Sequence, residues 1–245
     1  MRILLLDLET APHLATVWGL WGQNVGINQI IESGYTLCWA AKWLGEKEVK
    51  FDSLQKSSKK MMIRRIHRLM SEADAVISYN GVKFDIPTIN KEFLLEGLNP
   101  PAPYAQIDLL KTARQRFRLA SNKLDYVAQT LGLGKKTQHK GHELWLGCMN
   151  GDESCWKTME RYNKNDVVLL EKVYNRLLPW IKGHPSIAVH DRDVVCPHCG
   201  GDHLQARGTY KTKVSEYQRY HCQDCGSWFR DNTIVSPRAR YQSIS

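Results

Sequence analysis

Four acidic side chains, widely separated along this chain of 245 residues, are the residues most able to do chemistry. Asp7 and Glu9 lie in LLLDLET, Asp85 ends SYNGVKFD, and Asp166 lies in YNKNDVVLL. Carboxylates that gather at one point repel each other unless cations compensate them. Because divalent metals held by carboxylates are a common apparatus for hydrolysing phosphodiester bonds, these residues favour a metal-dependent nuclease.

A buried strand is expected to position the first two acids. Residues 2–8 read RILLLDL, an apolar run typical of a strand that opens a fold. Asp7 and Glu9 are two residues apart, so their side chains point to the same face of that strand. A solvated strand end is the ordinary interpretation of Asp-x-Glu. Here Asp7 follows four apolar residues, so a buried position on the strand is expected instead. Burying two like charges together is costly unless a cation compensates them.

The other two acids are expected at the end of a strand and on a helix. Asp85 follows a short apolar strand at 75–78 and precedes a helix at 86–97, where it could also be a helix cap. Asp166 lies on a long helix predicted at 154–181, with Tyr162 one turn earlier on the same face. An exposed acid beside a partly buried aromatic ring is the alternative for that pair.

The remaining pattern predicts an α/β fold with a mixed sheet. Residues 35–51 read as an antiparallel hairpin with its turn at 45–46, and 107–110 as a short strand or a strand-to-helix junction. Further helices are expected at 57–72, 109–118 and 122–131, the last capped by Ser121 or Asn122. Asp108 is expected to be a helix N-cap, and an extra acid near the metals is the alternative. The polar stretch 134–153, which includes His139 to Glu143, is expected to be a loop.

Taken together, these segments resemble the DEDD 3′→5′ exonuclease superfamily, whose members have an RNase H-like fold. Its motif D-x-E matches Asp7 to Glu9, and its motif N-x(2–3)-F/Y-D matches Asn80 to Asp85. Its third motif, in the tyrosine form Y-x(3)-D, matches Tyr162 to Asp166, whereas the histidine form would need His where Arg161 stands. The resemblance covers roughly residues 1–182 and implies a mixed sheet flanked by helices.

The resemblance also implies roles for single residues. Asp7, Glu9, Asp85 and Asp166 would hold two Mg²⁺ or Mn²⁺ ions, which supply an activated water and neutralise the departing 3′ oxygen. Tyr162 would orient that water, because a tyrosine with an ordinary pKa near 10 is a poor base at neutral pH. Contacts with the terminal nucleotides are implied for Asn80 and Phe84, with Lys123 as a further substrate contact.

Residues 11–34 are irregular and depart from the shortest members of that superfamily. Trp18 and Trp21 in this segment are candidates for stacking on unpaired bases. Packing against the sheet is the simpler interpretation, and we expect it.

A net charge of +9 favours a polyanionic partner such as nucleic acid. The lysines and arginines gather in three runs, for which solvated helix faces are the alternative to a phosphate track. The runs are Lys56, Lys59, Lys60, Arg64, Arg65 and Arg68; Lys111, Arg114, Arg116, Arg118 and Lys123; and Lys135, Lys136 and Lys140. No apolar run is long enough to span a membrane, and no secretion signal is recognisable, so a cytoplasmic protein is expected.

Four cysteines near the end of the chain predict a structural zinc site. Cys196 and Cys199 form one C-x-x-C-G knuckle, and Cys222 and Cys225 form another. Four thiolates suit tetrahedral zinc and leave no open position for catalysis. Between the knuckles, residues 210–220 alternate in the pattern typical of a β-hairpin, so residues 183–245 resemble a zinc ribbon. Lys211, Lys213, Arg219, Arg230, Trp228 and Phe229 are its candidate contacts with nucleic acid.

The combined expectation is an RNase H-like nuclease domain at 1–182 followed by a zinc ribbon at 183–245. The expected activity is 3′→5′ exonucleolytic hydrolysis of single-stranded DNA or frayed 3′ ends, with two Mg²⁺ or Mn²⁺ and one Zn²⁺. Two alternatives stay open: a nucleic-acid-binding adaptor that does not cut, and an RNase H-like endonuclease. Protein partners in replication or repair are not predicted.

Overall fold

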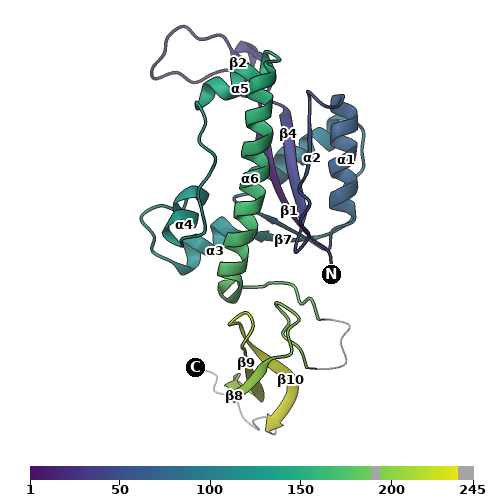
Figure 1. The fold of residues 1–245 in the computed structure, drawn as a ribbon, viewed down its shortest axis with the longest axis vertical. Coiled ribbons are helices and arrows are strands. Elements are labelled where there is room, and N and C mark those ends of the chain that lie inside the picture. Colours follow the sequence, from purple (N-terminus) through teal and green to yellow (C-terminus); the bar gives the residue numbers. More distant parts are fainter. Residues whose placement is uncertain (189–193, 237–245) are drawn as a thin grey trace. The chain divides into compact units, whose positions relative to one another are not determined.

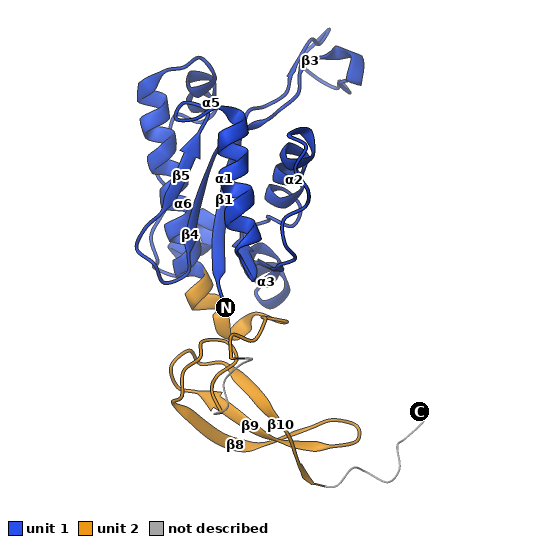
Figure 2. Ribbon diagram, turned by 90° about the vertical axis from the view of Figure 1, so that its right-hand side faces the viewer, with its two compact units in different colours: residues 1–173 blue, residues 174–245 orange. Residues whose placement is uncertain are grey.

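The computed structural model describes residues 1–188 and 194–236. Within it the chain divides into two compact units, Met1–Val173 and Tyr174–Ser245, coloured separately in Figure 2. No helix in the described ranges has the length and apolarity that a bilayer crossing needs.

A mixed five-stranded sheet forms the centre of the first unit, in the order β5-β4-β1-β6-β7 (Figure 1). Its strands are β1 (Ile3–Thr10), β4 (Thr36–Trp43), β5 (Lys50–Ser53), β6 (Ala75–Ser78) and β7 (Ala105–Asp108). β1 pairs antiparallel with β4 and parallel with β6, and β6 pairs parallel with β7. The predicted hairpin and the mixed α/β sheet flanked by helices are confirmed.

Helices cover both faces of this sheet. They are α1 (Lys59–Ser71), α2 (Asp85–Leu95), α3 (Leu109–Arg116), α4 (Leu124–Thr130), α5 (His142–Met149) and α6 (Glu153–Leu177). α1 begins where the hydroxyl of Ser58 accepts a hydrogen bond from the backbone N–H of Met61. Its apolar stripe, which includes Met62, Ile66 and Met70, is fully buried, and its charged residues lie on the opposite face.

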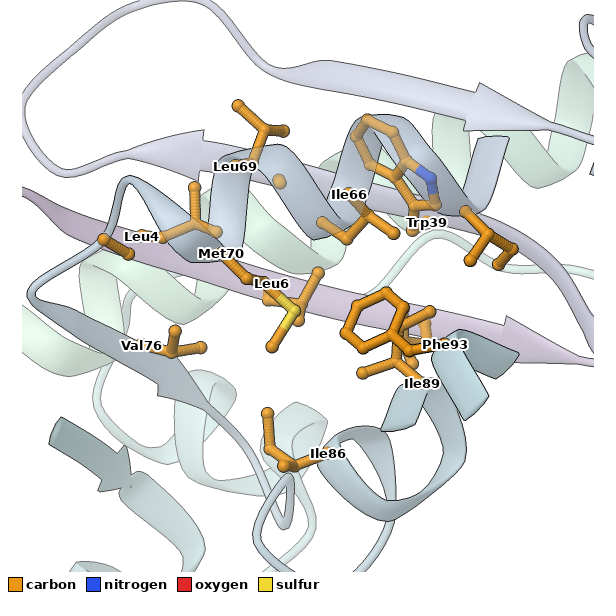
Figure 3. Close-up of a cluster of buried hydrophobic side chains, with 14 of the residues drawn as sticks. Leu4, Leu6, Trp39, Ile66, Leu69, Met70, Val76, Ile86, Ile89 and Phe93 are labelled. Carbon is orange, nitrogen blue, oxygen red and sulfur yellow. The ribbon is translucent and has the colours of Figure 1, made fainter. Parts of the chain in front are cut away.

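The main hydrophobic core lies between one face of the sheet and the pair α1 and α2. Alternate residues of β1, namely Leu4, Leu6 and Leu8, contribute to it together with Trp39 from β4 and Ile66 from α1. Figure 3 shows Leu4, Leu6 and Trp39 of the strands lying among side chains from the two helices, such as Ile66 and Phe93.

The opposite face of the sheet is covered by α5 and α6. Leu144 and Cys148 of α5 pack with Met159 and Tyr162 of α6 in a second core. Lower along α6, Glu171 accepts hydrogen bonds from Lys42 Nζ at 2.5 Å and from the backbone N–H of Gly45 at 2.9 Å. Because Lys42 lies on β4 and is buried, this ion pair fixes α6 on the sheet.

Two local expectations are wrong. The expected loop 134–153 contains the helix α5, because Leu144 and Cys148 recur at helical spacing and are buried against α6. The N-cap of α4 is Lys123, rather than Ser121 or Asn122. Ser121 instead accepts a hydrogen bond from the N–H of Lys123 at 3.3 Å, so its hydroxyl closes the turn before the helix.

A short arm leaves the sheet between β1 and β4. It contains the two-stranded pair β2 (Leu14–Ala15) and β3 (Ile30–Glu32) and the 3₁₀ turn η1 (Ile27–Gln29). The backbone N–H of Ala11 donates to Tyr35 O at 2.8 Å and closes the base of the arm. Figure 2 shows the part around β3 extending away from the helices of its unit.

The second unit contains the last turn of α6, the 3₁₀ turn η2 (Leu178–Trp180) and a three-stranded antiparallel sheet. The strands are β8 (Leu204–Lys211), β9 (Glu216–Cys222) and β10 (Trp228–Ser236), in the order β10-β9-β8. β8 and β9 form the predicted hairpin. β10 was not predicted, because bulges between Arg230 and Ser236 break its alternation.

Candidate metal centre and nucleic-acid site

β1 and α6 bring three of the four acids together. One carboxylate oxygen each from Asp7, Glu9 and Asp166 lies within 4.8 Å of the others. Asp7 and Glu9 point to the same face of β1, as their spacing predicts, because Leu4, Leu6 and Leu8 occupy the opposite face. Asp166 comes from α6, which covers the face carrying the two acids.

Asp85 approaches this group from the first turn of α2. Its Oδ1 accepts a hydrogen bond from the backbone N–H of Leu8 at 3.1 Å. Asp85 therefore lies against β1 at the residue that separates Asp7 from Glu9. Asp85 is not one of the three residues whose oxygens cluster within 4.8 Å, although its charge raises the pKa of Asp7. It is therefore a neighbour of the cluster.

The loop between β6 and α2 is built to place Asp85. Asn80 adopts a left-handed backbone conformation with φ of 72°. Its N–H donates to Oδ1 of Asp108 at 2.9 Å, and the same oxygen accepts hydrogen bonds from the N–H groups of Leu110 and Lys111. The predicted N-cap role of Asp108 is confirmed, and Asp108 also links the end of β7 to this loop.

Gly81 allows a close approach in the same loop. A Cβ at this position would lie 2.1 Å from Oγ of Ser78 and 3.3 Å from Oδ2 of Asp85. Only a residue without a side chain fits between β6 and the Asp85 carboxylate.

Two residues that the sequence did not single out hold the acids of β1. Nδ2 of Asn163 on α6 donates to Oδ2 of Asp7 at 2.6 Å and to the backbone oxygen of Asp7 at 3.3 Å. The side chain of Trp145 on α5 donates a hydrogen bond to Glu9. Asn163 lies inside the segment from Tyr162 to Asp166, so helical spacing offered a signal for it, whereas Trp145 lies in the stretch expected to be a loop.

Lys136 is the most consequential residue that sequence reasoning missed. Its Nζ lies 2.5 Å from Oδ2 of Asp166 and 3.1 Å from the hydroxyl of Tyr162. The sequence places it only in a basic run, and no local pattern indicates that it enters the acidic cluster. Its position supplies one positive charge to a group of four carboxylates.

Burial and mutual repulsion raise the pKa values of these carboxyl groups. The pKa of Asp7 lies well above its usual range, because of burial first and then the charges of Glu9, Asp85 and Asp166. Burial raises the pKa of Glu9 to about 8 against the opposing charge of Lys136, and that of Asp85 to about 6 against the hydrogen bond from Leu8. Burial also raises the pKa of Asp166, and Lys136 lowers it.

The residues present fit a divalent cation. Within the described ranges, Oδ1 of Asp166 is buried and has no hydrogen-bond partner, although Lys136 binds the other oxygen. A buried carboxylate oxygen without a donor is costly, and a cation would satisfy it. All four candidate ligands are carboxylates, which are the donors that Mg²⁺ and Mn²⁺ prefer.

Tyr162 lies beside the cluster and is buried. Its hydroxyl accepts a hydrogen bond from Lys136 and donates one to Asp166. Burial, followed by the charges of Glu9 and Asp166, raises its pKa above the usual value. The phenol therefore stays protonated at neutral pH and can orient a reactant, but it is a poor base.

A pocket of about 600 Å³ opens beside the acids. Asp7 and Lys136 contribute to its wall, together with Arg114 and the predicted substrate residue Lys123. Phe84, the residue before Asp85, is 45% exposed, so its ring is available at the opposite end of the same loop from Asn80. The pocket therefore places Arg114, Lys123 and Lys136 beside the carboxylate of Asp7.

The arm exposes its tryptophans almost completely. Trp18 is 98% and Trp21 is 90% exposed, so the expectation that they pack against the sheet is wrong. The physical reason is that the two-stranded base holds residues 17–25 away from the body of the unit. Residues 11–34 contain no lysine or arginine, so contacts of this arm with nucleic acid would involve bases more than phosphates.

Much of the first basic run is engaged with carboxylates. Lys56 pairs with Glu160, Arg65 with Asp52, and Arg68 with Glu72, while Lys59 lies 2.8 Å from Glu92. This part of the chain is therefore a weaker phosphate track than its composition suggests. The second run instead reaches the pocket through Arg114 and Lys123.

The four cysteines of the second unit also converge. Sγ of Cys196 lies 3.7 Å from Sγ of Cys225, Sγ of Cys199 lies 3.6 Å from Sγ of Cys222, and all four sulfurs lie within 4.8 Å. Tetrahedral zinc with Zn–S bonds of about 2.3 Å separates its sulfurs by about 3.8 Å. The glycines that follow the knuckles, Gly200 and Gly226, have positive φ, as the tight turns require.

Comparison with known proteins agrees with this architecture. No curated protein matches the chain. Among solved structures, the chain is similar to the family B DNA polymerase from the hyperthermophilic archaeon Pyrobaculum calidifontis, with a TM-score of 0.55 and 18% sequence identity. The likeness covers 73% of this chain and 24% of the polymerase chain, so this protein spans about a quarter of its length, and at this identity the likeness shows the fold alone.

A family profile adds evidence from sequence. The RNase_H superfamily (RNase_H_2) matches residues 34–178, which is more than half of the chain and includes Asp85, Tyr162 and Asp166. The matched segment begins after β1, so Asp7 and Glu9 lie outside it. The chain belongs to the RNase_H superfamily.

Proposed function

We propose that this protein is a metal-dependent 3′→5′ exonuclease of the tyrosine DEDD type, which releases nucleotides from single-stranded DNA or frayed DNA ends. The observation that carries the proposal is the convergence of Asp7, Glu9 and Asp166 within 4.8 Å, with Asp85 hydrogen-bonded to the same strand. Such a buried group of like charges is expensive unless cations bind it. In a metal-dependent nuclease, the bound cations remove the repulsion between these carboxylates.

In this proposal Asp7, Glu9, Asp85 and Asp166 hold two Mg²⁺ or Mn²⁺ ions, which when bound supply an activated water and stabilise charge on the departing 3′ oxygen. The chain's own groups keep the ligands in place. Asn163 fixes Asp7, Trp145 fixes Glu9, and the N–H of Leu8 fixes Asp85. These contacts from α5, α6 and β1 pre-organise the ligands before substrate binds.

Tyr162 and Lys136 are proposed to position the scissile phosphate and the attacking water. The protonated hydroxyl of Tyr162 is a donor directed at Asp166, and it can turn toward a water molecule in the same place. Lys136 lies 3.1 Å from that hydroxyl and can donate to a phosphate oxygen. Neither residue has to give up a proton for these roles.

Substrate contacts are proposed at three places in the first unit. Lys123 and Arg114 line the pocket next to Asp7, where a phosphate backbone would meet positive charge. Asn80 and Phe84 belong to the loop that leads to Asp85, and the exposed Trp18 and Trp21 offer aromatic faces to unpaired bases.

The second part of the chain is proposed to be a zinc ribbon. The nuclease domain would occupy residues 1–182, and residues 183–245 would hold one structural Zn²⁺ through Cys196, Cys199, Cys222 and Cys225. A unit of this size buries little core, so zinc would supply much of its folding free energy.

Cleavage of labelled DNA tests the proposal. A 5′-labelled single strand incubated with Mg²⁺ or Mn²⁺ is expected to give a descending ladder with wild type and no products with Asp7→Ala. Internal cuts in a circular single strand would replace the exonuclease with an RNase H-like endonuclease. Binding without any cleavage in either metal would leave an adaptor that does not cut.

A further inference from the structure

The sheet of the second unit carries arginine and aromatic side chains on one of its two faces. The guanidinium carbon of Arg230 lies 3.8 Å from the ring centre of Tyr217 and 5.8 Å from that of Tyr210. On the neighbouring part of the face, Arg219 lies 5.0 Å from the ring centre of Trp228. These contacts join all three strands, since Tyr210 belongs to β8, Tyr217 and Arg219 to β9, and Trp228 and Arg230 to β10.

The strand register divides the aromatic residues of β9 and β10 between the two faces of the sheet. Trp228 is paired with His221 on the face of the arginines, and their rings stack with centres 4.6 Å apart. Phe229 is paired with Tyr220 on the opposite face, and their rings stack with centres 5.5 Å apart. Because successive side chains of a strand alternate between faces, Phe229 does not share the face of Trp228 and Arg230. The candidate nucleic-acid residues of this unit are thereby divided into two groups.

The arginines of this face lack acidic partners. Among residues 194–236, ion pairs involve Asp224 with His203 and Glu216 with Lys211, and none involves Arg219 or Arg230. The Nε of Arg219 donates to the backbone oxygen of Arg207, and Arg230 donates to that of Asp231. Each guanidinium therefore keeps its full charge while a ring and a backbone oxygen restrict its movement.

This combination has a specific chemical complement. Trp228 is 47% and Tyr210 is 48% exposed, so aromatic surface is open to solvent beside the two guanidinium groups. Phosphates bind guanidinium groups, and unpaired bases stack on aromatic rings. A duplex hides its base faces, and an acidic protein segment has no stacked bases to offer.

We propose that this face, which we call the ribbon face and define as Tyr210, Tyr217, Arg219, His221, Trp228 and Arg230, binds single-stranded nucleic acid. Arg219 and Arg230 contact phosphates, and Trp228 and Tyr210 stack on bases. The proposal rests on the proposed nuclease function only in taking nucleic acid as the partner. It adds a second binding surface, in a different unit from the carboxylates.

Fluorescence anisotropy with the full-length chain tests this surface. Every variant carries Asp7→Asn and the titrations omit Mg²⁺ and Mn²⁺, so that a labelled 20-nucleotide single strand is bound and not cut. We expect Trp228→Ala and Arg230→Ala each to weaken binding by about 5-fold or more. Arg230→Ala should also reduce the slope of log K against log salt by about 0.7, the value for one phosphate contact to a single strand.

Lys182→Ala is the matched control for charge. Lys182 is exposed in the turn that follows η2 in the same unit, so its loss removes one positive charge without touching the ribbon face. Arg230→Lys keeps the charge and removes the planar stacking, and an intermediate affinity is expected. Zinc content and thermal melting of each variant show whether the unit is folded, and only variants matching the parent in both are compared.

Three results would overturn the proposal. One is binding by folded Trp228→Ala and Arg230→Ala that equals the parent. Another is an equal loss of affinity with Lys182→Ala, which would indicate unspecific attraction by positive charge. The third is displacement of the strand by polyglutamate as effectively as by unlabelled strand, which would indicate an acidic protein partner. Cleavage is not measured, so a chain that cuts DNA but fails here loses this proposal alone.

Discussion

Nζ of Lys136 lies 2.5 Å from Oδ2 of Asp166, inside a cluster of acids that otherwise repel each other. This pair joins the loop after α4 to α6, and it leaves Oδ1 of Asp166 buried without a hydrogen-bond partner among the described residues. One lysine cannot neutralise Asp7, Glu9, Asp85 and Asp166 together. Ionising all four carboxyl groups therefore requires further positive charge, which is the physical basis for proposing a metal centre here.

Lys136→Met tests the ion pair. We expect the variant to lose about 2 kcal/mol of folding free energy in buffer without added Mg²⁺ or Mn²⁺, because Asp166 then lacks its charged donor. Added Mn²⁺ should raise the melting temperature of the variant more than that of wild type, since the metal no longer competes with the ammonium group. Lys135→Met, which changes an exposed neighbour, is the control and should behave as wild type. A Lys136→Met protein as stable as wild type in both conditions would contradict this account.

Glu9 predicts how stability depends on pH. Its folded-state pKa of about 8 lies above its usual value of 4.5, so the folded state binds this proton more tightly than the unfolded state. The stability that this proton contributes is fully present below pH 4.5 and is lost as the pH rises through 8. Glu9→Gln, which stays neutral, should therefore become more stable than wild type as the pH rises, by about 4–5 kcal/mol at pH 8.5.

Urea unfolding at pH 5 and pH 8.5 without added Mg²⁺ or Mn²⁺ measures this difference. Glu143→Gln, at an exposed position on α5, is the control and should show no such trend. If the difference in unfolding free energy between Glu9→Gln and wild type is the same at both pH values, the folded state does not raise the pKa of Glu9.

Gly81→Ala should disturb the placement of Asp85. The new Cβ would meet Ser78 Oγ at 2.1 Å and Ser78 Cβ at 2.4 Å, so the loop must shift. Overpacking of this kind costs about 1–3 kcal/mol. We expect a lower melting temperature together with weaker Mn²⁺ binding by calorimetry. Val82→Ala, next to it and exposed, should change neither, and wild-type Mn²⁺ affinity in Gly81→Ala would remove Asp85 from the proposed ligands.

The cysteine cluster predicts one zinc ion per chain. Elemental analysis of wild type should find it, and Cys222→Ser should lose it and become sensitive to protease after residue 182, because zinc supplies folding free energy. Cys155→Ser is the control, since Cys155 lies outside the cluster. Wild-type protein that is folded and protease-resistant without zinc would refute the zinc ribbon.

The sequence predicted the architecture and the converging acids because both depend on local periodicity. Alternation on β1 fixes the common face of Asp7 and Glu9, and helical spacing fixes Tyr162 and Asp166. Lys136 and Trp145 could not be predicted in the same way, since the acids that they contact, Asp166 and Glu9, lie 30 residues or more away and their own surroundings show no pattern. The exposure of Trp18 could not be predicted either, because a tryptophan side chain is ordinarily mostly buried and only the geometry of the arm shows that this one is not.

Mn²⁺ binding followed by electron paramagnetic resonance tests the central claim most directly, because it measures the metal at the four acids without requiring cleavage. Titration of wild type should show bound Mn²⁺ approaching two ions per chain, the number that the proposed two-metal mechanism requires. Asp7→Asn, which keeps the shape and removes one charge, should lose most of that binding while staying folded. Equal Mn²⁺ binding by folded Asp7→Asn and wild type would contradict the proposed metal centre.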